Sequence, residues 1–131
     1  MREYLFRGKR VDNDAWVEGL LIIIWGQYHI IQPNDENTAY PIIFKTVGQY
    51  TGMTDKNGTK IFEGDIIDFL YRSDGDDYGI VQYDVDETEF GFVHNLIYDG
   101  LGRHYCSRDI EVIGNIYDNP ELMKGEKNND P

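Results

Sequence analysis

The chain has 131 residues, 40% of them hydrophobic and 14% aromatic, which is enough apolar material for the core of one domain or of two very small ones. Its formal net charge of −12 repels nucleic acids and anionic membranes from the molecule as a whole. The single cysteine, Cys106, excludes an internal disulfide. Since no signal peptide is visible and no apolar run could span a bilayer, we expect a soluble cytoplasmic protein without membrane contact.

The first part of the chain alternates between strands and turns. Residues 1–10 alternate loosely and predict a first strand, and residues 16–25 predict a long one. The second half of the long strand is apolar on both faces, so we expect it to be central or covered on both sides. A tight turn at residues 26–27 would let residues 28–31 pair back as a hairpin, and residues 32–40 predict a polar loop.

A second hairpin is predicted around Asn57-Gly58. A two-residue type I′ turn needs a positive φ at both central residues, and Asn and Gly adopt that conformation at the lowest steric cost. The strand that leaves this turn is interrupted at residues 63–65 and resumes over residues 66–71. Asp65, in the interruption, could accept hydrogen bonds from turn N–H groups.

Short strands continue to the end of the chain. Residues 79–85 alternate between polar and apolar, and residues 110–117 form the closing strand, with Gly114 as the site of a bulge or bend. Asn119-Pro120 marks the start of a short helical turn, with Asn as its cap. Turns at intervals of roughly 8–12 residues are typical of all-β proteins.

We therefore predict an all-β fold. An N-terminal strand and hairpin region, residues 1–48, packs on a C-terminal β region, residues 49–118. A short helical turn and flexible tail follow over residues 119–131, and the whole is expected to form one compact unit. The predicted core residues are Phe6, Trp16, Leu21, Ile23, Ile31, Phe62, Ile67, Phe69, Val81, Tyr83, Phe92, Val112 and Ile116.

Several segments of the chain resemble the YopX family, whose members are small proteins encoded by bacteriophages and prophages. The matching segments are REYLFR at residues 2–7, the strand from Trp16, QYTG at 49–52, DKNG at 55–58, IFEGDI at 61–66 and IGNIYDNPEL at 113–122. The resemblance implies a mostly β protein that acts in the cytoplasm of the bacterial host cell. It also implies that the C-terminal region is similar to a small SH3-like barrel, and it carries no established biochemical activity.

No motif predicts catalysis or nucleotide binding, since the chain has no nucleophile elbow, no GxxxxGK[ST] and no GxGxxG. His104 and Cys106 would share a face in a strand, and such a pair can activate a thiolate. The alternative is that Cys106 is a small, buried filler. Residues 74–77, DGDD, lack the glutamate that an EF-hand has at its twelfth position, which here is Val85. We expect no enzymatic activity, no metal and no cofactor.

The leading functional prediction is a non-enzymatic phage accessory protein that binds a host or phage protein. Residues 74–89 carry seven acidic residues and no Lys or Arg, so a folded acidic ribbon could mimic a nucleic-acid backbone and occupy a basic groove. The alternative is a solvated segment that keeps the protein soluble, and the family-motif residues have a structural alternative as turn residues. The candidate partner-binding residues are Tyr50, Glu63, Asp65, Asp84, Asp86 and Glu87.

The alternative function is a nucleic-acid-associated small β-barrel that uses the basic first strand. Small barrels bind single strands by stacking bases on aromatic rings beside a basic groove, and Tyr4 and Phe6 could supply such rings. The competing interpretation is a basic edge strand that blocks unwanted strand pairing. The candidate nucleic-acid contacts are Arg2, Arg7, Lys9 and Arg10.

The oligomeric state is predicted from strand edges. The strands at residues 16–25 and 28–31 are apolar enough that pairing with another copy would be a natural way to cover their edges. We therefore expect a homo-oligomer.

Overall fold

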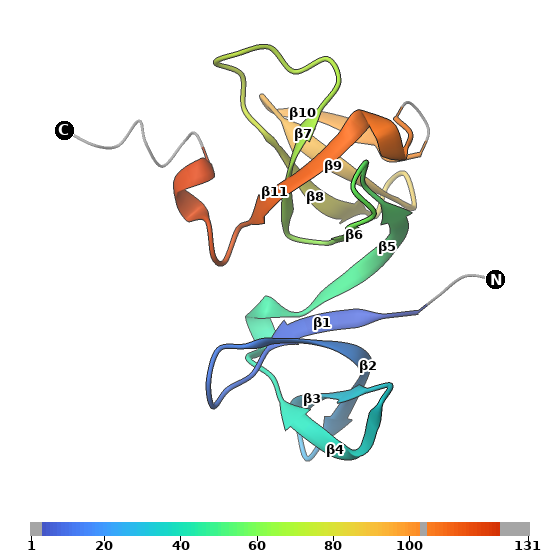
Figure 1. Cartoon of the computed structure of the whole chain (residues 1–131), viewed down its shortest axis with the longest axis vertical. Helices are drawn as coiled ribbons and strands as arrows, with labels where there is room; N and C mark the ends of the chain where they lie inside the picture. The colour runs from blue at the N-terminus through green and yellow to red at the C-terminus, as the bar shows by residue number, and fades with distance from the viewer. Residues whose placement is uncertain (1–3, 103–104, 124–131) are drawn as a thin grey trace. The chain divides into compact units, whose positions relative to one another are not determined.

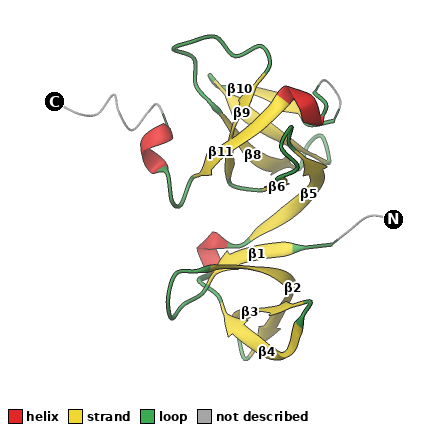
Figure 2. Ribbon diagram, viewed as in Figure 1, coloured by secondary structure: helices red, strands yellow, loops and turns green. Residues whose placement is uncertain are grey.

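The computed structural model describes residues 4–102 and 105–123 (Figure 1). Over these residues the chain forms eleven β-strands and three single-turn 3₁₀ helices, labelled η, so the predicted all-β fold class is confirmed (Figure 2). The chain divides into two compact units, unit 1 over Met1–Tyr50 and unit 2 over Thr51–Pro131.

Unit 1 is an antiparallel sheet with the strand order β4-β3-β2-β1-β5. Its elements are β1 (Phe6–Lys9), β2 (Trp16–Ile24), β3 (Gln27–Gln32), β4 (Asp35–Pro41), η1 (Phe44–Thr46) and the first residues of β5 (Gly48–Thr54). Phe6 of β1 pairs with Gly19 of β2 and with Gln49 of β5, so β1 has a neighbour on each side. The interpretation of the first strand as a basic edge is therefore wrong. The predicted hairpin of β2 and β3 is confirmed, with Leu20 opposite Ile31.

Most of the polar segment at residues 32–40 is strand rather than the predicted loop: Gln32 ends β3, residues 33–34 form a turn, and β4 follows. β4 pairs with β3 and has no further neighbour in the strand order, so it is an edge strand. Edge strands carry polar residues because one of their sides faces water. The Asp35 carboxylate accepts hydrogen bonds from the hydroxyls of Thr38 (3.0 Å) and Tyr40 (2.7 Å), which fixes the polar side chains locally. Polarity alone therefore does not identify a loop here.

The core of unit 1 is small. Val17, Ile30 and Ile42 are buried, and Gly8 and Gly19 allow the close approach because a Cβ at either position would overlap a neighbouring residue. β2 is central in the strand order, as predicted, but its second half is not covered on both faces. The predicted core residue Ile23 is 59% exposed, because the three-residue core ends before it.

Unit 2 contains a five-stranded antiparallel sheet with the order β10-β9-β8-β7-β11, and β6 lies beside the end of β5. Its elements are β6 (Lys60–Phe62), β7 (Asp65–Phe69), β8 (Gly79–Asp84), β9 (Glu89–His94), β10 (Ile97–Gly100), η2 (Ser107–Asp109), β11 (Ile110–Asn115) and η3 (Pro120–Leu122). In the described residues this sheet is open, with β10 and β11 as its edges. The SH3-like barrel is therefore not confirmed.

The core of unit 2 is larger and aromatic. The Phe69 and Phe92 ring centroids lie 4.9 Å apart, and Tyr105 contacts both rings edge-on. The full buried cluster consists of Ile61, Ile67, Phe69, Val81, Phe92, Tyr105 and Ile110. Four of these were predicted, but Tyr83 was wrongly placed in the core. It is 41% exposed, because the inward face of β8 is the one that carries Val81 and Gly79, and the strand has left the core by residue 83.

The β5–β6 connection differs in type from the predicted type I′ turn. Only Gly58 has a positive φ (+83°), and its N–H donates to the Asp55 carbonyl. The Asp55 side chain organises the loop: one carboxylate oxygen accepts the N–H groups of Asn57 and Thr59, and the other accepts that of Val112, all at 2.9 Å. Burial raises the pKa of this carboxyl, but the three backbone donors outweigh burial and hold the pKa below its ordinary value.

The C-terminal predictions are confirmed in part. The pairing of β11 with β7 shifts register between Val112 and Gly114, which is the predicted bulge. The predicted helical turn is η3. Its preceding residue, Asn119, does not cap it, because the Asn119 side-chain oxygen accepts the N–H of Asn115 instead (3.1 Å). The amide thus closes the turn between β11 and η3.

Candidate functional site

The turn between β2 and β3 carries a tryptophan in an unfavourable backbone conformation. Ile24 and Gln27 form the last pair of the hairpin, so the turn consists of Trp25 and Gly26, one residue earlier than predicted. Both have a positive φ, +53° for Trp25 and +78° for Gly26, as a type I′ turn requires. Asn is a preferred residue at the first position, whereas the left-handed conformation costs a residue with a Cβ roughly 1–2 kcal/mol. Turn formation therefore does not account for Trp25.

The side chain of Trp25 does not contribute to packing either. It is 99% exposed, so its ring makes almost no contact with the described part of the chain. Backbone strain that the surrounding structure does not explain is a pointer to function, and tryptophan is among the residues most enriched at the energetic centres of protein interfaces. We therefore take Trp25 as the starting point of the candidate site.

A hollow of about 550 Å³ begins directly after Trp25 in unit 1. The rings of Tyr28 and Phe44 lie in its wall, with their centroids 4.9 Å apart, and Phe44 is 65% exposed. The Gln27 side-chain amide donates to the carbonyls of Tyr28 and Ile42, both at 3.0 Å, which holds two sides of the wall together. The lining carries no charged side chain and consists of Val11, Gly26, Gln27, Tyr28, Ile42, Ile43 and Phe44.

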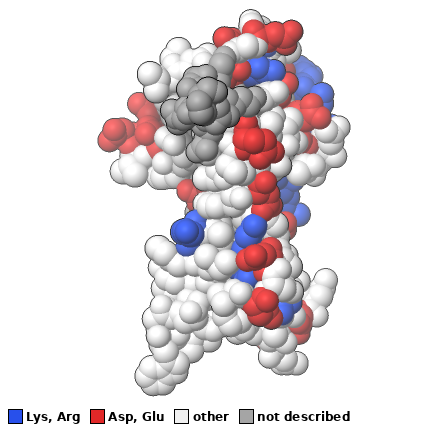
Figure 3. All heavy atoms as spheres, turned by 90° about the vertical axis from the view of Figure 1, so that its left-hand side faces the viewer, with Lys and Arg blue, Asp and Glu red and all other residues white. Residues whose placement is uncertain are grey.

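Unit 1 exposes further apolar side chains at the end of the β2–β3 hairpin. On the face shown in Figure 3, the end of unit 1 with the β2–β3 turn, at the bottom of the view, is almost without Lys, Arg, Asp and Glu. Monomeric proteins rarely expose large contiguous apolar areas, and such areas mark interaction sites. We call the exposed apolar side chains at this end the apolar surface of unit 1. They are Val11, Leu20, Ile23, Ile24, Trp25 and Phe44, with Leu20 and Ile24 on the other face of β2 from Ile23.

Unit 2 has a comparable hairpin tip in a different setting. Asn95 and Leu96 connect β9 to β10, both have a positive φ, and Leu96 is fully exposed. The neighbouring cavity of about 200 Å³ is lined by apolar side chains but also by Asp77 and His94. Leu96, at the second position of its turn, therefore has a positive φ and an exposed side chain as Trp25 has, but its surroundings carry charge, which makes it a natural control for Trp25.

The predicted basic residues are only partly brought together. Arg7 and Lys9 lie on the same side of β1, with their charged groups 4.7 Å and 5.6 Å from the centroid of the Trp16 ring. Arg10 instead pairs with the Asp12 carboxylate at 2.6 Å, and this hydrogen bond raises the pKa of the guanidinium. Arg2 lies outside the described residues. Two of the four candidate nucleic-acid contacts thus flank one aromatic ring, and nucleic-acid binding stays a prediction.

Two of the predicted partner-binding residues are buried. Tyr50 is 8% exposed, and Asp65 is 2% exposed and accepts the N–H of Phe62 at 2.7 Å, which is the turn role predicted for it. Glu63, beside Asp65 in the β6–β7 turn, is half-buried. A role for these residues in binding a partner stays a prediction, but Tyr50 and Asp65 offer little surface to one.

The acidic residues of the β8–β9 turn are more accessible. The Asp84 carboxylate accepts the N–H of Glu87 at 3.0 Å, so it has a structural role in the turn. Asp86 and Glu87 are exposed. At the other end of the acidic segment, Arg72 donates to the carbonyl of Asp76 at 3.0 Å, so a cation from outside the segment lies against it. Whether the acidic segment binds a partner also stays a prediction.

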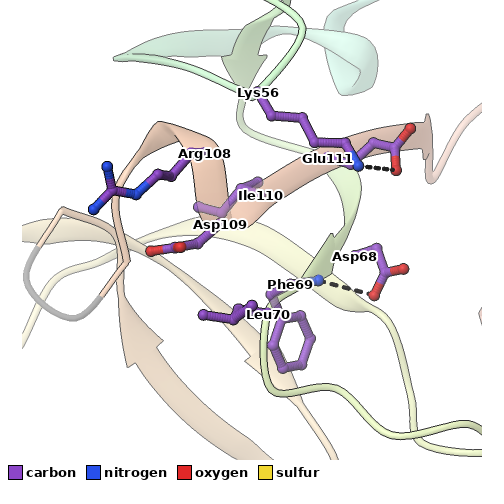
Figure 4. A pocket seen from close by; sticks show the side chains of 8 residues that line it. All are labelled: Lys56, Asp68, Phe69, Leu70, Arg108, Asp109, Ile110 and Glu111. Carbon is purple, nitrogen blue, oxygen red and sulfur yellow. Dashed lines mark hydrogen bonds and ion pairs between the residues drawn. The ribbon is translucent and has the colours of Figure 1, made fainter.

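A shallow depression of about 180 Å³ lies between β7 and β11 of unit 2 (Figure 4). Three of its charged groups form ion pairs: Lys56 pairs with Glu111 at 3.3 Å, and Asp68 pairs with Arg72 at 2.7 Å. Leu70 is exposed at its edge. The complete lining is Lys56, Asp68, Phe69, Leu70, Arg108, Asp109, Ile110 and Glu111. With most of its charged groups engaged and a smaller volume, the depression offers less to a ligand than the hollow of unit 1.

Unit 2 also contains a histidine–carboxylate pair that the sequence analysis missed. The Nε2 atom of His94 lies 2.7 Å from a carboxylate oxygen of Asp99, and its ring packs 4.7 Å from that of Phe69. A five-residue spacing across a hairpin turn is the signal that could have revealed it, because both residues flank the β9–β10 turn. Such a pair can orient a general base, but no hydroxyl or thiol in the described residues hydrogen-bonds to His94.

Cys106 is exposed rather than a buried filler. Its thiol lies 3.3 Å from a carboxylate oxygen of Asp109, which also accepts the Cys106 N–H at 2.9 Å. The N–H and then the thiol lower the pKa of Asp109. Cationic neighbours, not carboxylates, activate thiolates, so this setting does not favour a nucleophile. His104 lies outside the described residues, which also contain no group of three or more metal-ligating side chains.

Fold and surface together define a small antiparallel β protein of two units, one of which exposes apolar side chains and a hollow without charged lining. The YopX protein family model matches residues 6–124, and the chain therefore belongs to this family. The predicted family resemblance is confirmed.

A solved structure supports the fold. The chain is similar to the crystal structure of protein EF1440 from Enterococcus faecalis, with 22% sequence identity, a TM-score of 0.55, and coverage of 95% of this chain and 100% of that one. A likeness at this identity shows the fold alone. No curated protein matches the chain. Within the residues described, no helix is long and apolar enough to cross a membrane.

Proposed function

We propose that this chain is a non-enzymatic, protein-binding accessory protein of a bacteriophage or prophage that acts in the cytoplasm of the bacterial host. We further propose that its contact surface is the apolar surface of unit 1. The observation that carries the proposal is Trp25, which is 99% exposed at a strained turn position. A partner that covers this ring would supply the stabilisation that folding alone does not supply.

The size of that stabilisation is large for a single side chain. An aromatic side chain buries about 150–250 Å², which at about 25 cal/mol per Å² corresponds to roughly 4–6 kcal/mol before the costs of association. The strain of the left-handed conformation is about 1–2 kcal/mol. Burial of Trp25 by a partner would therefore outweigh the strain. In the isolated chain the ring stays exposed, so no burial energy offsets the strain.

A pull-down with two matched variants tests the proposal. Trp25→Asn removes the ring and creates the Asn-Gly pair that a type I′ turn prefers, so it keeps the hairpin. Leu96→Gly makes the corresponding change at the Asn95-Leu96 turn of unit 2. Tagged wild-type chain is incubated with bacterial host lysate and with an untagged copy of the chain, with and without nuclease, and the captured proteins are identified by mass spectrometry.

We expect wild-type chain and the Leu96→Gly variant to retain the same protein partner after nuclease treatment, and the Trp25→Asn variant to lose it. Equal capture by all three proteins would show that the partner does not bind through the apolar surface of unit 1. Capture of nothing by the wild-type chain would contradict the protein-binding proposal itself.

The second candidate function is nucleic-acid contact, because Arg7 and Lys9 flank the Trp16 ring. Residues 1–50 carry five Lys and Arg against six Asp and Glu, so unit 1 has a formal charge of only −1. Binding of a single-stranded oligonucleotide that weakens steeply with salt and is lost when Arg7 and Lys9 are both changed to Glu would favour this candidate. We expect no such binding if the protein partner is the functional one.

A further inference from the structure

We propose that the partner of the apolar surface of unit 1 is a second copy of this chain, and that Trp25 of each copy inserts into the hollow of the other. This inference rests on the proposed function and names its partner. A two-fold contact requires a surface that is complementary to itself, for example a projection beside a recess. Unit 1 has both, because Trp25 projects from the turn and the hollow begins at Gly26 and Gln27.

The hollow is not filled by the chain's own tryptophan. A ring that is 99% exposed cannot occupy a recess of its own unit. The walls contain the rings of Tyr28 and Phe44, tilted by 53° to one another, which offer a face and an edge to an incoming indole. Gln27 uses its side-chain amide on two carbonyls of the wall, so the recess is already formed in the single copy.

Electrostatic repulsion between two identical chains is expected to be weakest when they meet through unit 1. Residues 51–131 carry seven Lys and Arg against eighteen Asp and Glu, a formal charge of −11, whereas residues 1–50 carry −1. Identical surfaces of unit 2 would repel one another, because like charges that face each other across an interface are unfavourable. The charge-free lining of the hollow has no such penalty, so a second copy meets the least repulsion there.

The aromatic side chains at the hollow supply the centre of the proposed contact. Specific interfaces bury about 800 Å² per partner. Trp25 and Phe44 are aromatic side chains of about 150–250 Å² each, and Trp25 is nearly fully exposed. Val11, which lines the hollow, and Ile23, which lies opposite Tyr28, add exposed apolar area to them.

The predicted homo-oligomer was based on strand-edge pairing, and part of the edges concerned is already hydrogen-bonded. β3 lies between β2 and β4, and β2 pairs with β1 over Trp16–Gly19 and with β3 over Leu20–Ile24. The contact proposed here uses side chains instead of backbone edges. Of the apolar residues that suggested self-pairing, Leu20, Ile23, Ile24 and Trp25 are exposed.

The first test is the mass of the full chain in solution. Light scattering or sedimentation of the wild-type chain at concentrations from about 1 to about 100 µM should show a shift from the 15.2 kDa monomer to twice that mass. Trp25→Asn should weaken dimerisation at least tenfold, and Leu96→Gly should leave it unchanged. Added salt should strengthen the dimer, because it screens repulsion between the acidic units and not an apolar contact. A monomeric wild-type chain, or a dimer that Trp25→Asn does not weaken, would overturn the proposal.

The second test examines the reciprocal insertion itself. Phe44→Asp places a charge in the hollow but leaves Trp25 intact, whereas Trp25→Asn leaves the hollow intact. Neither variant should dimerise alone, but a mixture should form a mixed dimer, because one copy supplies the ring and the other the hollow. Differently tagged variants would show this by co-purification. A mixture that associates no better than either variant alone would contradict the insertion of Trp25 into the partner's hollow.

The two proposals fail in different ways. If the wild-type chain captures a lysate protein through Trp25 but stays monomeric, the protein-binding function stands and the second copy is the wrong partner. If Trp25→Asn changes neither capture nor mass, both proposals fall together.

Discussion

The two units of this protein differ in the size of their cores and in their charge. Unit 2 buries seven apolar residues in one cluster, three of them aromatic, and carries a formal charge of −11. The buried cluster of unit 1 consists of Val17, Ile30 and Ile42, and this unit carries −1. Both units leave large apolar residues exposed, but the hollow beside them in unit 1 has no charged lining, whereas the cavity at Leu96 of unit 2 is lined in part by Asp77 and His94. Exposed aromatic residues contribute to stability only when a partner covers them.

Under the proposed function, the two units would have separate tasks. Acidic surface keeps a protein soluble and opposes non-specific contact with nucleic acids and membranes. Apolar surface without charge favours association and would promote aggregation in a chain without a compensating acidic region. The negative charge of unit 2 would then oppose aggregation through the apolar surface of unit 1. The following predictions test this division, beginning with the largest effect.

Phe92→Ala should destabilise unit 2 by about 3–5 kcal/mol, because it removes a fully buried ring that contacts Phe69 and Tyr105. The free energy of unfolding would be measured by urea denaturation, followed by far-UV circular dichroism. As a contrast, Phe44→Ala in unit 1 should change stability by less than about 0.5 kcal/mol, because Phe44 is largely exposed. Similar losses for both variants would contradict the difference between the two cores.

Asp55→Ala should destabilise unit 2 by roughly 3 kcal/mol, because it leaves the N–H groups of Asn57, Thr59 and Val112 without their acceptor. The folded pKa of Asp55 is lowered, so its stabilisation is fully present above the ordinary pKa of 3.8 and is lost as the pH falls below that value. Urea denaturation of the wild-type chain from neutral to acidic pH should show this loss.

A matched variant separates the carboxylate from the rest of Asp55. Asp55→Asn keeps the size of the side chain and one acceptor oxygen, so its loss of stability at neutral pH should be smaller than that of Asp55→Ala. It should also flatten the decline in stability below about pH 4, because an amide does not titrate. If Asp55→Asn declined with acid as steeply as the wild-type chain, another group would have to be responsible.

Trp25→Asn should stabilise unit 1 by about 1 kcal/mol at concentrations where the chain is monomeric, because Asn accepts the left-handed conformation that Trp25 adopts at φ +53°. Thermal unfolding monitored by circular dichroism would detect the increase. Leu96→Gly should stabilise unit 2 for the same reason. Only Trp25→Asn should reduce association. A destabilising effect of Trp25→Asn would mean that the ring supports folding and would weaken its assignment as a contact residue.

Local patterns predicted most strands and hairpins but not the details of their turns. The hairpin at Asn57-Gly58 is present, but the side chain of Asp55 and its bond to the distant Val112 select another turn type. A bond between residues 57 positions apart leaves no local signal. Conversely, Trp25 lay inside an apolar run that predicted burial, and only the register of Ile24 with Gln27 shows that it occupies the turn.

The apolar character of the candidate site could be predicted, but its exposure and its assembly from separate elements could not. An apolar strand followed by Gly26 indicates a hairpin, but exposure depends on how many layers cover the sheet, which no single segment determines. The hollow brings together Val11, Tyr28 and Phe44 from separate elements. Asp84 was predicted from the charge of its segment and Asp65 from the family motif, and neither signal shows that Asp65 is buried or that Asp84 accepts a turn N–H.

The smallest effect is expected from the acidic turn of unit 2. Asp86 and Glu87 are exposed, so changing them to Asn and Gln should alter stability by less than about 0.5 kcal/mol. Asp84 is left unchanged because its carboxylate accepts the Glu87 N–H. If unit 1 supplies the contact surface, the double variant should capture the same partner as the wild-type chain in the pull-down. Loss of capture, with folding intact by circular dichroism, would instead place the contact on the acidic segment, because these two charges offer a partner nothing except electrostatic attraction.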